Sequence, residues 1–126
     1  MNSIYSGLGK NIIEKTGMSE LGKPLRIFMH NEQDEIVGGL AGNIFGGWIY
    51  ISLLWIDKSI RGKGYGTKLM QMAQKEAIKS GCKHIHLDTY SFEARPFYER
   101  LGFEVFAVLE DYPQGHNKFF LKKHLA

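Results

Sequence analysis

The sequence has very little cysteine and no long hydrophobic run. Its single cysteine, Cys82, excludes an internal disulfide and a zinc site built from several cysteines, and a lone thiol is typical of a reducing compartment. No apolar run approaches the roughly 18 residues that a bilayer-spanning helix needs. The residues from Met1 to Lys10 also lack the basic stretch and hydrophobic core of a secretion signal. We therefore expect a soluble cytoplasmic protein with no membrane partner.

The sequence also lacks a strong excess of either charge. The chain has 16 Lys and Arg against 13 Asp and Glu, which leaves a net charge of +3 with the positive residues scattered. This weak positive charge does not by itself indicate a nucleic-acid partner, and we expect none. The length of 126 residues and the 44% hydrophobic content fit one domain, residues 1–126, with its own core.

Hydrophobic periodicity predicts a mixed α+β fold. Alternating, β-branched or aromatic segments predict strands over residues 25–31, 36–45, 48–57, 83–90, 103–110 and 118–123. Apolar residues at steps of three and four predict helices over residues 64–80 and 95–101, with one short helix within residues 1–23. Because a helix joins segments 48–57 and 83–90, these two strands should be parallel, flanked by antiparallel hairpins. A ligand can enter a sheet at such a junction.

Glycine is in excess, at fifteen residues, and three glycines alternate in one turn. The turn spans residues 59–67 and reads Ser-Ile-Arg-Gly-Lys-Gly-Tyr-Gly-Thr, between a predicted strand and the long helix. Free N–H groups at a helix N-terminus attract phosphate, and glycines let the main chain curl around an anion. The nucleotide P-loop does not match, and Thr67 stands where the dinucleotide fingerprint has its third glycine. The turn predicts a pyrophosphate site, with a plain tight turn as the alternative.

The pattern Arg61-x-x-Gly64-x-Gly66 resembles the coenzyme-A signature of the GNAT family of N-acetyltransferases. Two further segments carry the resemblance. Leu54-x-Ile56 is similar to the central strand of the family, and residues 97–103, Phe-Tyr-Glu-Arg-Leu-Gly-Phe, are similar to its later helix. The resemblance implies the GNAT fold: a mostly antiparallel twisted sheet with one splayed parallel strand pair, helices on both faces and, in this chain, a shortened N-terminal region.

The resemblance also implies acetyl-CoA as co-substrate, and no metal. The pantetheine arm would lie between the two parallel strands and bond to the backbone near Leu54 and Ile56. The pyrophosphate would lie against main-chain amides at Arg61, Gly62, Lys63, Gly64, Tyr65, Gly66 and Thr67. Many members carry an asparagine where this chain has Phe92. Ser91 is a candidate replacement for that contact.

Acetyl transfer needs a neutral amine, a donor to the developing oxyanion and an acid for the departing thiolate. Tyr98 aligns with the tyrosine acid of the family. A phenol with a pKa of ~10 can stay protonated beside a thiol of ~8.5. The alternative is a tyrosine that only packs beside Phe97 and Leu101. Asp88 is the best placed carboxylate for a general base, although a base acting through water would leave no signature in the sequence.

The shortened N-terminal region predicts an acceptor cleft that is open or that a second subunit closes, so we expect a homodimer. Within the hairpin loop 110–116, Glu110 and Asp111 are candidate contacts to an amine-bearing, cationic acceptor. Nothing in the sequence selects among small-molecule and peptide amines.

The leading hypothesis is an N-acetyltransferase that acts on a primary amine by direct attack in a ternary complex. A coenzyme-A-binding module without catalysis and a basic nucleic-acid-binding domain are the alternatives. A metal could use Cys82, His84, His86 and Asp88 on one strand face, but a covered strand gives the same alternation. The aromatic residues of the meander, Phe45, Trp48, Tyr50 and Trp55, are expected to make core or subunit contacts.

Overall fold

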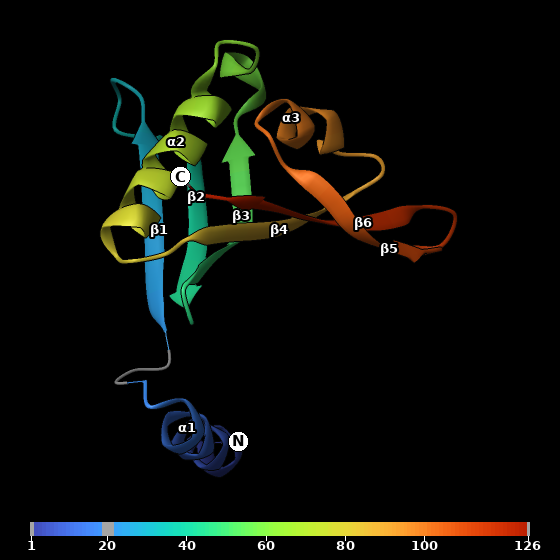
Figure 1. The fold of residues 1–126 in the computed structure, drawn as a ribbon. Helices are drawn as coiled ribbons and strands as arrows, with labels where there is room; N and C mark the ends of the chain where they lie inside the picture. Colours follow the sequence, from blue (N-terminus) through green and yellow to red (C-terminus); the bar gives the residue numbers. More distant parts are fainter. Residues whose placement is uncertain (1, 19–21, 126) are drawn as a thin grey trace.

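The structure is a computed structural model that describes residues 2–18 and 22–125. In chain order the elements are α1 (Asn2–Thr16), β1 (Lys23–His30), β2 (Ile36–Phe45), β3 (Trp48–Ile56), a short 3-10 turn (Lys58–Ile60), α2 (Tyr65–Lys79), β4 (His84–Tyr90), α3 (Arg95–Arg100), β5 (Glu104–Glu110) and β6 (Asn117–His124). The strands form one sheet in the order β1-β2-β3-β4-β6-β5. In Figure 1, α2 is drawn across β1 and β2, α3 lies near β5 and β6, and α1 lies below the lower tip of β1.

The antiparallel meander at one side of the sheet follows directly from the sequence. Strand β2 has the predicted bounds, and β2 and β3 are joined by Gly46 and Gly47, whose φ angles are +60° and +85°. A two-residue hairpin turn of this kind needs positive φ at both positions, which glycine adopts without strain. The turn therefore sets Phe45 opposite Trp48 and fixes the register of the hairpin.

Strands β3 and β4 are parallel, as predicted, but they pair at one end only. Their Cα partners run from Trp48 with His84 to Ile51 with Leu87. On the other edge of β3, Ala41 pairs with Leu53 and Gly42 with Ile51. This leaves Ser52 as an extra residue. A bulge of this type bends its strand and increases the twist, so β3 turns away from β4 after Ile51. The splayed parallel pair that the family resemblance implies is confirmed.

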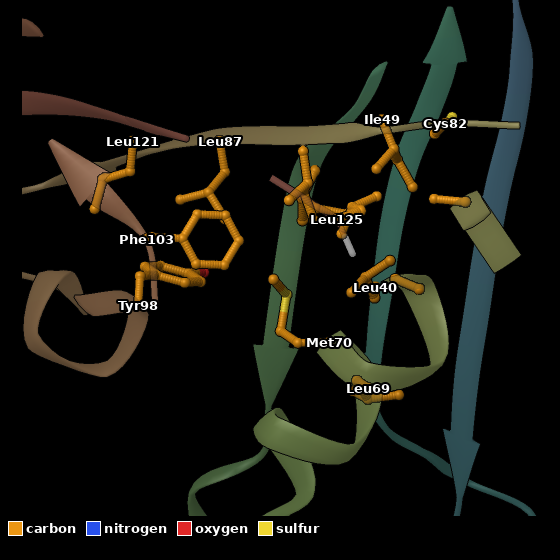
Figure 2. Close-up of a cluster of buried hydrophobic side chains, with 14 of the residues drawn as sticks. Leu40, Ile49, Leu69, Met70, Cys82, Leu87, Tyr98, Phe103, Leu121 and Leu125 are labelled. Atoms are coloured by element: carbon orange, nitrogen blue, oxygen red, sulfur yellow. The ribbon is translucent and has the colours of Figure 1, made fainter. Parts of the chain in front are cut away.

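The core lies between α2, α3 and one face of the sheet. Helix α2 buries Leu69, Met70, Ala73 and Ala77, the predicted apolar positions, and the strands contribute Leu40, Ile49, Ile51, Ile85, Leu87 and Leu121. Figure 2 shows Leu69 and Met70 facing the strands, with Tyr98 and Phe103 closing one end. These two rings meet edge to face, with centroids 5.9 Å apart. The predicted core is confirmed, and α3 seals it beside β4.

The opposite face of the sheet carries aromatic residues that the core does not cover. Phe45 and Trp55 are 38% and 42% exposed, so they do not belong to the core, and the subunit contact expected as the alternative stays a prediction. The pleat explains this, because their neighbours Ile44, Leu54 and Ile56 take the core side. Helix α1 stands apart from the sheet beyond the N-terminal end of β1 (Figure 1) and is the one helix before β1 in the described residues. No helix of the described residues is long and apolar enough to cross a membrane.

Candidate active site

The glycine turn forms a hollow of about 230 Å³ at the start of α2. Its walls are turn residues together with Ile56 from β3 and Phe97 from α3. Gly62 and Gly64 have φ angles of +78° and +83°, and a Cβ on either would meet no heavy atom within 4 Å. Glycine is therefore required here by the left-handed backbone and not by crowding.

Six consecutive amides of this turn, those of residues 62–67, have no protein hydrogen-bond partner among the described residues. On either side of them, the Arg61 N–H donates to the Lys58 carbonyl at 3.4 Å and the Lys68 N–H donates to the Gly64 carbonyl at 3.1 Å. The last three of the six amides open α2, where the helix dipole is positive. This arrangement can bind a diphosphate through main-chain N–H groups alone.

The side chain of Arg61 stabilises the turn. Its Nε atom donates to the Ile56 carbonyl at 2.8 Å, so the side chain folds back on the end of β3. Asp57 accepts a hydrogen bond from the Ser59 N–H at 3.0 Å and caps the 3-10 turn. Hydrogen bonds from Ser59 keep the pKa of Asp57 below its ordinary value. Both side chains hold the crossover in shape, and Asp57 is engaged as a cap.

Gly66 brings the two sequence motifs together in space. A Cβ at this position would lie 3.3 Å from Cζ of Phe97, closer than most side chains approach. Phe97 in turn meets the Tyr98 ring edge to face, with centroids 5.1 Å apart. The first turn of α2 therefore packs against α3 at a distance that glycine permits, and one ring connects the anion hollow to Tyr98.

Tyr98 is 7% exposed, and among the described residues its hydroxyl has no hydrogen-bond partner. Among the described residues, no fully buried side-chain oxygen lacks a hydrogen-bond partner. The hydroxyl oxygen of Tyr98 has none, so it must be at least partly accessible to solvent. Figure 2 shows it directed away from α3. Burial, helped by the charges of Glu93 and Asp88, raises the pKa of Tyr98 to about 12. The phenol is therefore protonated at any ordinary pH.

Asp88 lies on the opposite face of the sheet from Tyr98. It is the first residue of β4 after the stretch that pairs with β3. Tyr50 donates to its Oδ2 atom at 2.8 Å, and the Lys118 ammonium lies 3.7 Å from its Oδ1 atom. Burial and this hydrogen bond raise the pKa of Tyr50 to about 12. Tyr50 therefore stays a donor and bridges β3 to β4 where the two strands begin to separate.

Comparison with known proteins decides the family, since residues 8–103 match the model of the acetyltransferase (GNAT) family. The chain belongs to the GNAT family. Blasticidin-S acetyltransferase of Streptomyces morookaense is 35% identical over 107 residues, which cover 82% of this chain and 79% of that protein. Acetyltransferase Atu2258 of Agrobacterium fabrum is 36% identical over 101 residues, which cover 80% and 74%. The crystal structure of an acetyltransferase from Bacillus cereus matches with a TM-score of 0.81 and 34% identity, covering 92% of this chain and 88% of that one.

The family resemblance given by the sequence motifs is thus confirmed, and the GNAT fold and an acetyltransferase activity with it. The anion hollow and the strand opening lie next to each other, because Ile56 at the end of β3 lines the hollow. On the side that faces β4, the backbone after Ile51 has no strand partner in the described part of the chain. Of the predicted cofactor residues, Ile56, Arg61, Gly62, Gly64, Tyr65, Gly66 and Thr67 line the hollow, and Leu54 lies on the part of β3 that does not pair with β4.

Two of the other predicted contacts, Ser91 and Asp111, are hydrogen-bonded within the fold. The Ser91 Oγ atom accepts from the Asn117 N–H at 3.0 Å, and the Ser91 N–H donates to the Asn117 carbonyl, which ties the exit of β4 to β6. In the hairpin loop, Asp111 accepts from the Gly115 N–H at 2.7 Å and so shapes the turn. Glu110 is exposed at the end of β5. Their roles toward cofactor and acceptor stay predictions.

The shared face considered for a metal does not form. Cys82 is buried on the core side, whereas His84, His86 and Asp88 project from the other face. Cys82 precedes β4, which begins at His84, so the alternation of the strand does not extend to it. Among the described residues, no group of three His, Cys, Asp or Glu side chains lies close enough to hold a metal ion.

Sequence reasoning missed a hollow of about 440 Å³ between α1 and the sheet. Tyr5 and Leu8 of α1 face Trp48 and Tyr50 of β3 and His86 of β4 across it. Burial lowers the pKa of His86 below its ordinary value of 6.5, although the charge of Asp88 opposes this. Its imidazole is therefore neutral at neutral pH. The alternation of His84, His86, Asp88 and Tyr90 with apolar residues could have indicated a polar second face.

Proposed function

We propose that the protein transfers the acetyl group of acetyl-CoA to a primary amine of a small molecule or peptide, by direct attack in a ternary complex. The observation that carries the proposal is the row of six unpartnered amides at the start of α2, beside the gap between β3 and β4. The amides match a diphosphate, and the unpaired edge of β3 after Ile51 matches an extended amide-bearing arm. A cytoplasmic location fits the free thiol of Cys82.

The test is calorimetry with acetyl-CoA and with desacetyl coenzyme A, followed by release of free thiol in the presence of mixed amines. We expect binding of both compounds and thiol release that depends on the amine. Absence of binding by well-folded protein would refute the proposal.

The reaction needs one proton donated to the leaving sulfur and one accepted from the amine, and the candidate residues for these two transfers lie on opposite faces of the sheet. The amine nitrogen forms a bond to the acetyl carbon while the carbon–sulfur bond breaks. Tyr98, on the core face, would donate to the sulfur as it leaves. The proton of the amine would go to the other face, where Asp88 is the predicted base. Both Asp88 oxygens are already engaged, so the neutral ring of His86, two residues earlier in β4, is a further candidate to receive it.

We expect the turnover rate at saturating acceptor to fall on acidification through the pKa of His86, which lies below 6.5. Below this pKa the ring is protonated and can no longer accept a proton, so activity is present above it and lost beneath it. The titratable groups beside the ring are Asp88 in β4, Tyr50 in β3, which stacks on the ring, and Lys122 in β6, which is the cross-strand partner of His86. A profile of kcat between about pH 5 and pH 8 tests this, because His86→Gln should remove the inflection. An identical inflection in the variant would assign it to another group.

A homodimer completes the proposal. Ile4 and Ile13 of α1 are 70% and 38% exposed and do not line the hollow, so a second subunit could cover them. We expect light scattering to give twice the chain mass at micromolar concentration, and Ile4→Glu to give a monomer. Ile78→Glu, at another exposed isoleucine (47%) on α2, is the control and should stay dimeric. A monomeric wild-type protein would contradict the proposal.

A further inference from the structure

The hollow beside α1 belongs to a larger uncharged depression. A second hollow, of about 410 Å³, shares Phe45, Trp48 and His86 with the first. We name the two together the aromatic trough, after its ring-bearing residues Tyr5, Phe45, Trp48, Tyr50, His86 and Phe106. No Asp, Glu, Lys or Arg of the described residues lines either hollow. The trough therefore offers rings and a few neutral polar groups to a ligand.

The rings on its floor are held by one another. Tyr50 stacks on His86 with centroids 4.9 Å apart and an interplanar angle of 28°, and Trp48 meets His86 edge-on at 5.5 Å. Trp48 also stacks on His84 at 4.5 Å. Because neighbouring strands position these rings, the floor is formed before any ligand binds. Such a preorganised surface favours stacked or edge-to-face contact with a flat ligand.

The trough lies next to the point where β3 and β4 begin to separate. Tyr50 lines it and donates to Asp88, and Asp88 is the first residue beyond the last paired position, Leu87. The gap between β3 and β4 is therefore reached from the trough along the face opposite Tyr98. A ligand that rests its body on Trp48 and Tyr50 could place an amine at this gap.

The charges near the trough disfavour a polycation. Asp88, which accepts from the trough residue Tyr50, is paired with Lys118, and Asp111 accepts a bond within its own turn. The imidazole of His86 is neutral, because burial lowers its pKa. A ligand with several ammonium groups would lose hydration without gaining a carboxylate partner in these walls, which is unfavourable. The expectation of acidic contacts to a cationic acceptor finds no support at the trough.

We propose that the acceptor is a monoamine with a flat aromatic body, which lies in the aromatic trough with its amine directed to the gap beside Asp88. This inference rests on the proposed acetyl transfer and names the class of its acceptor. Contact with the rings supplies affinity for the body of the acceptor, and the uncharged walls exclude further ammonium groups.

The experiment compares phenethylamine, hexylamine and hexamethylenediamine as acceptors of acetyl from acetyl-CoA, by kcat/KM. Phenethylamine and hexylamine differ in the aromatic ring, and hexylamine and hexamethylenediamine differ in the second ammonium group. We expect phenethylamine to exceed each aliphatic amine by about tenfold or more, since an aromatic body buries its apolar surface on the trough. Phe45→Ala should remove most of this preference. Phe28→Ala is the matched control, because Phe28 is an exposed ring on β1 that lines neither hollow.

The outcomes separate this inference from the proposed function. If hexamethylenediamine is used as well as phenethylamine or better, the inference is wrong although acetyl transfer stands. If no amine is acetylated, the proposed function fails. Calorimetry of phenethylamine binding to the wild type, Phe45→Ala and Phe28→Ala then tests whether the trough binds an aromatic amine. Binding that is weakened about tenfold only by Phe45→Ala supports an aromatic site. Equal or undetectable binding in all three proteins overturns it.

Discussion

Replacing Tyr98 by Phe should lower the kcat of acetyl transfer by about 100-fold and leave the affinity for acetyl-CoA unchanged. The substitution removes a single oxygen, which lies on the core side of the strand gap without a protein partner in the described residues. Its pKa of about 12 keeps the hydroxyl protonated, so it can donate to sulfur as negative charge develops there. The affected step is the departure of the thiolate. Stopped-time assays of thiol release and calorimetry of acetyl-CoA measure the two quantities separately.

The fold should tolerate this variant, which makes the comparison clean. The ring keeps its edge-to-face contacts with Phe97 and Phe103, and no hydrogen bond within the described residues is lost. We therefore expect thermal unfolding to be unchanged within the roughly 0.5 kcal/mol typical of a neutral substitution. A variant that folds, binds acetyl-CoA and turns over at the wild-type rate would show that Tyr98 only packs. That is the alternative left open by the sequence.

The sequence predicts every strand and helix of the main body to within about two residues, because local signals and tertiary packing agree there. The segment 36–45 alternates and is followed by two glycines, and β2 has these bounds in the structure. The helix predicted over residues 64–80 buries the predicted apolar positions, with Gly64 and Ser80 as its caps. The extra residue at Ser52 could not be read locally, since a bulge depends on the register with a neighbouring strand.

The two parts of the candidate site differ in how far the sequence reveals them. Seven of the nine residues that line the anion hollow lie within residues 60–67, so one segment of sequence contains most of it. The aromatic trough takes Tyr5 from α1, Phe45 from β2, Trp48 from β3 and His86 from β4. Each of these residues by itself looks like a core residue. Only the pleat of the assembled sheet decides which face each ring takes.

Gly64→Ala should weaken acetyl-CoA binding by about 10- to 100-fold. The residue caps α2 with a φ of +83°, and its added Cβ would project where no protein atom lies within 4 Å, at the hollow. The methyl group would hinder the approach of a diphosphate to the amides around it. Loss of one charge-assisted hydrogen bond is worth about 1.5–3 kcal/mol, which gives the stated range. Calorimetric titration measures the change.

Backbone strain needs its own control, because a side chain at positive φ destabilises the fold by about 1 kcal/mol wherever it occurs. Gly81, just past the other end of α2, has a φ of +85° and equally open surroundings. Gly81→Ala should therefore lower the melting temperature as much as Gly64→Ala does and leave acetyl-CoA affinity at the wild-type value. If both variants lose affinity equally, strain in α2 explains the effect. If neither does, the amides of residues 62–67 do not bind the diphosphate, and the proposed placement of acetyl-CoA fails with them.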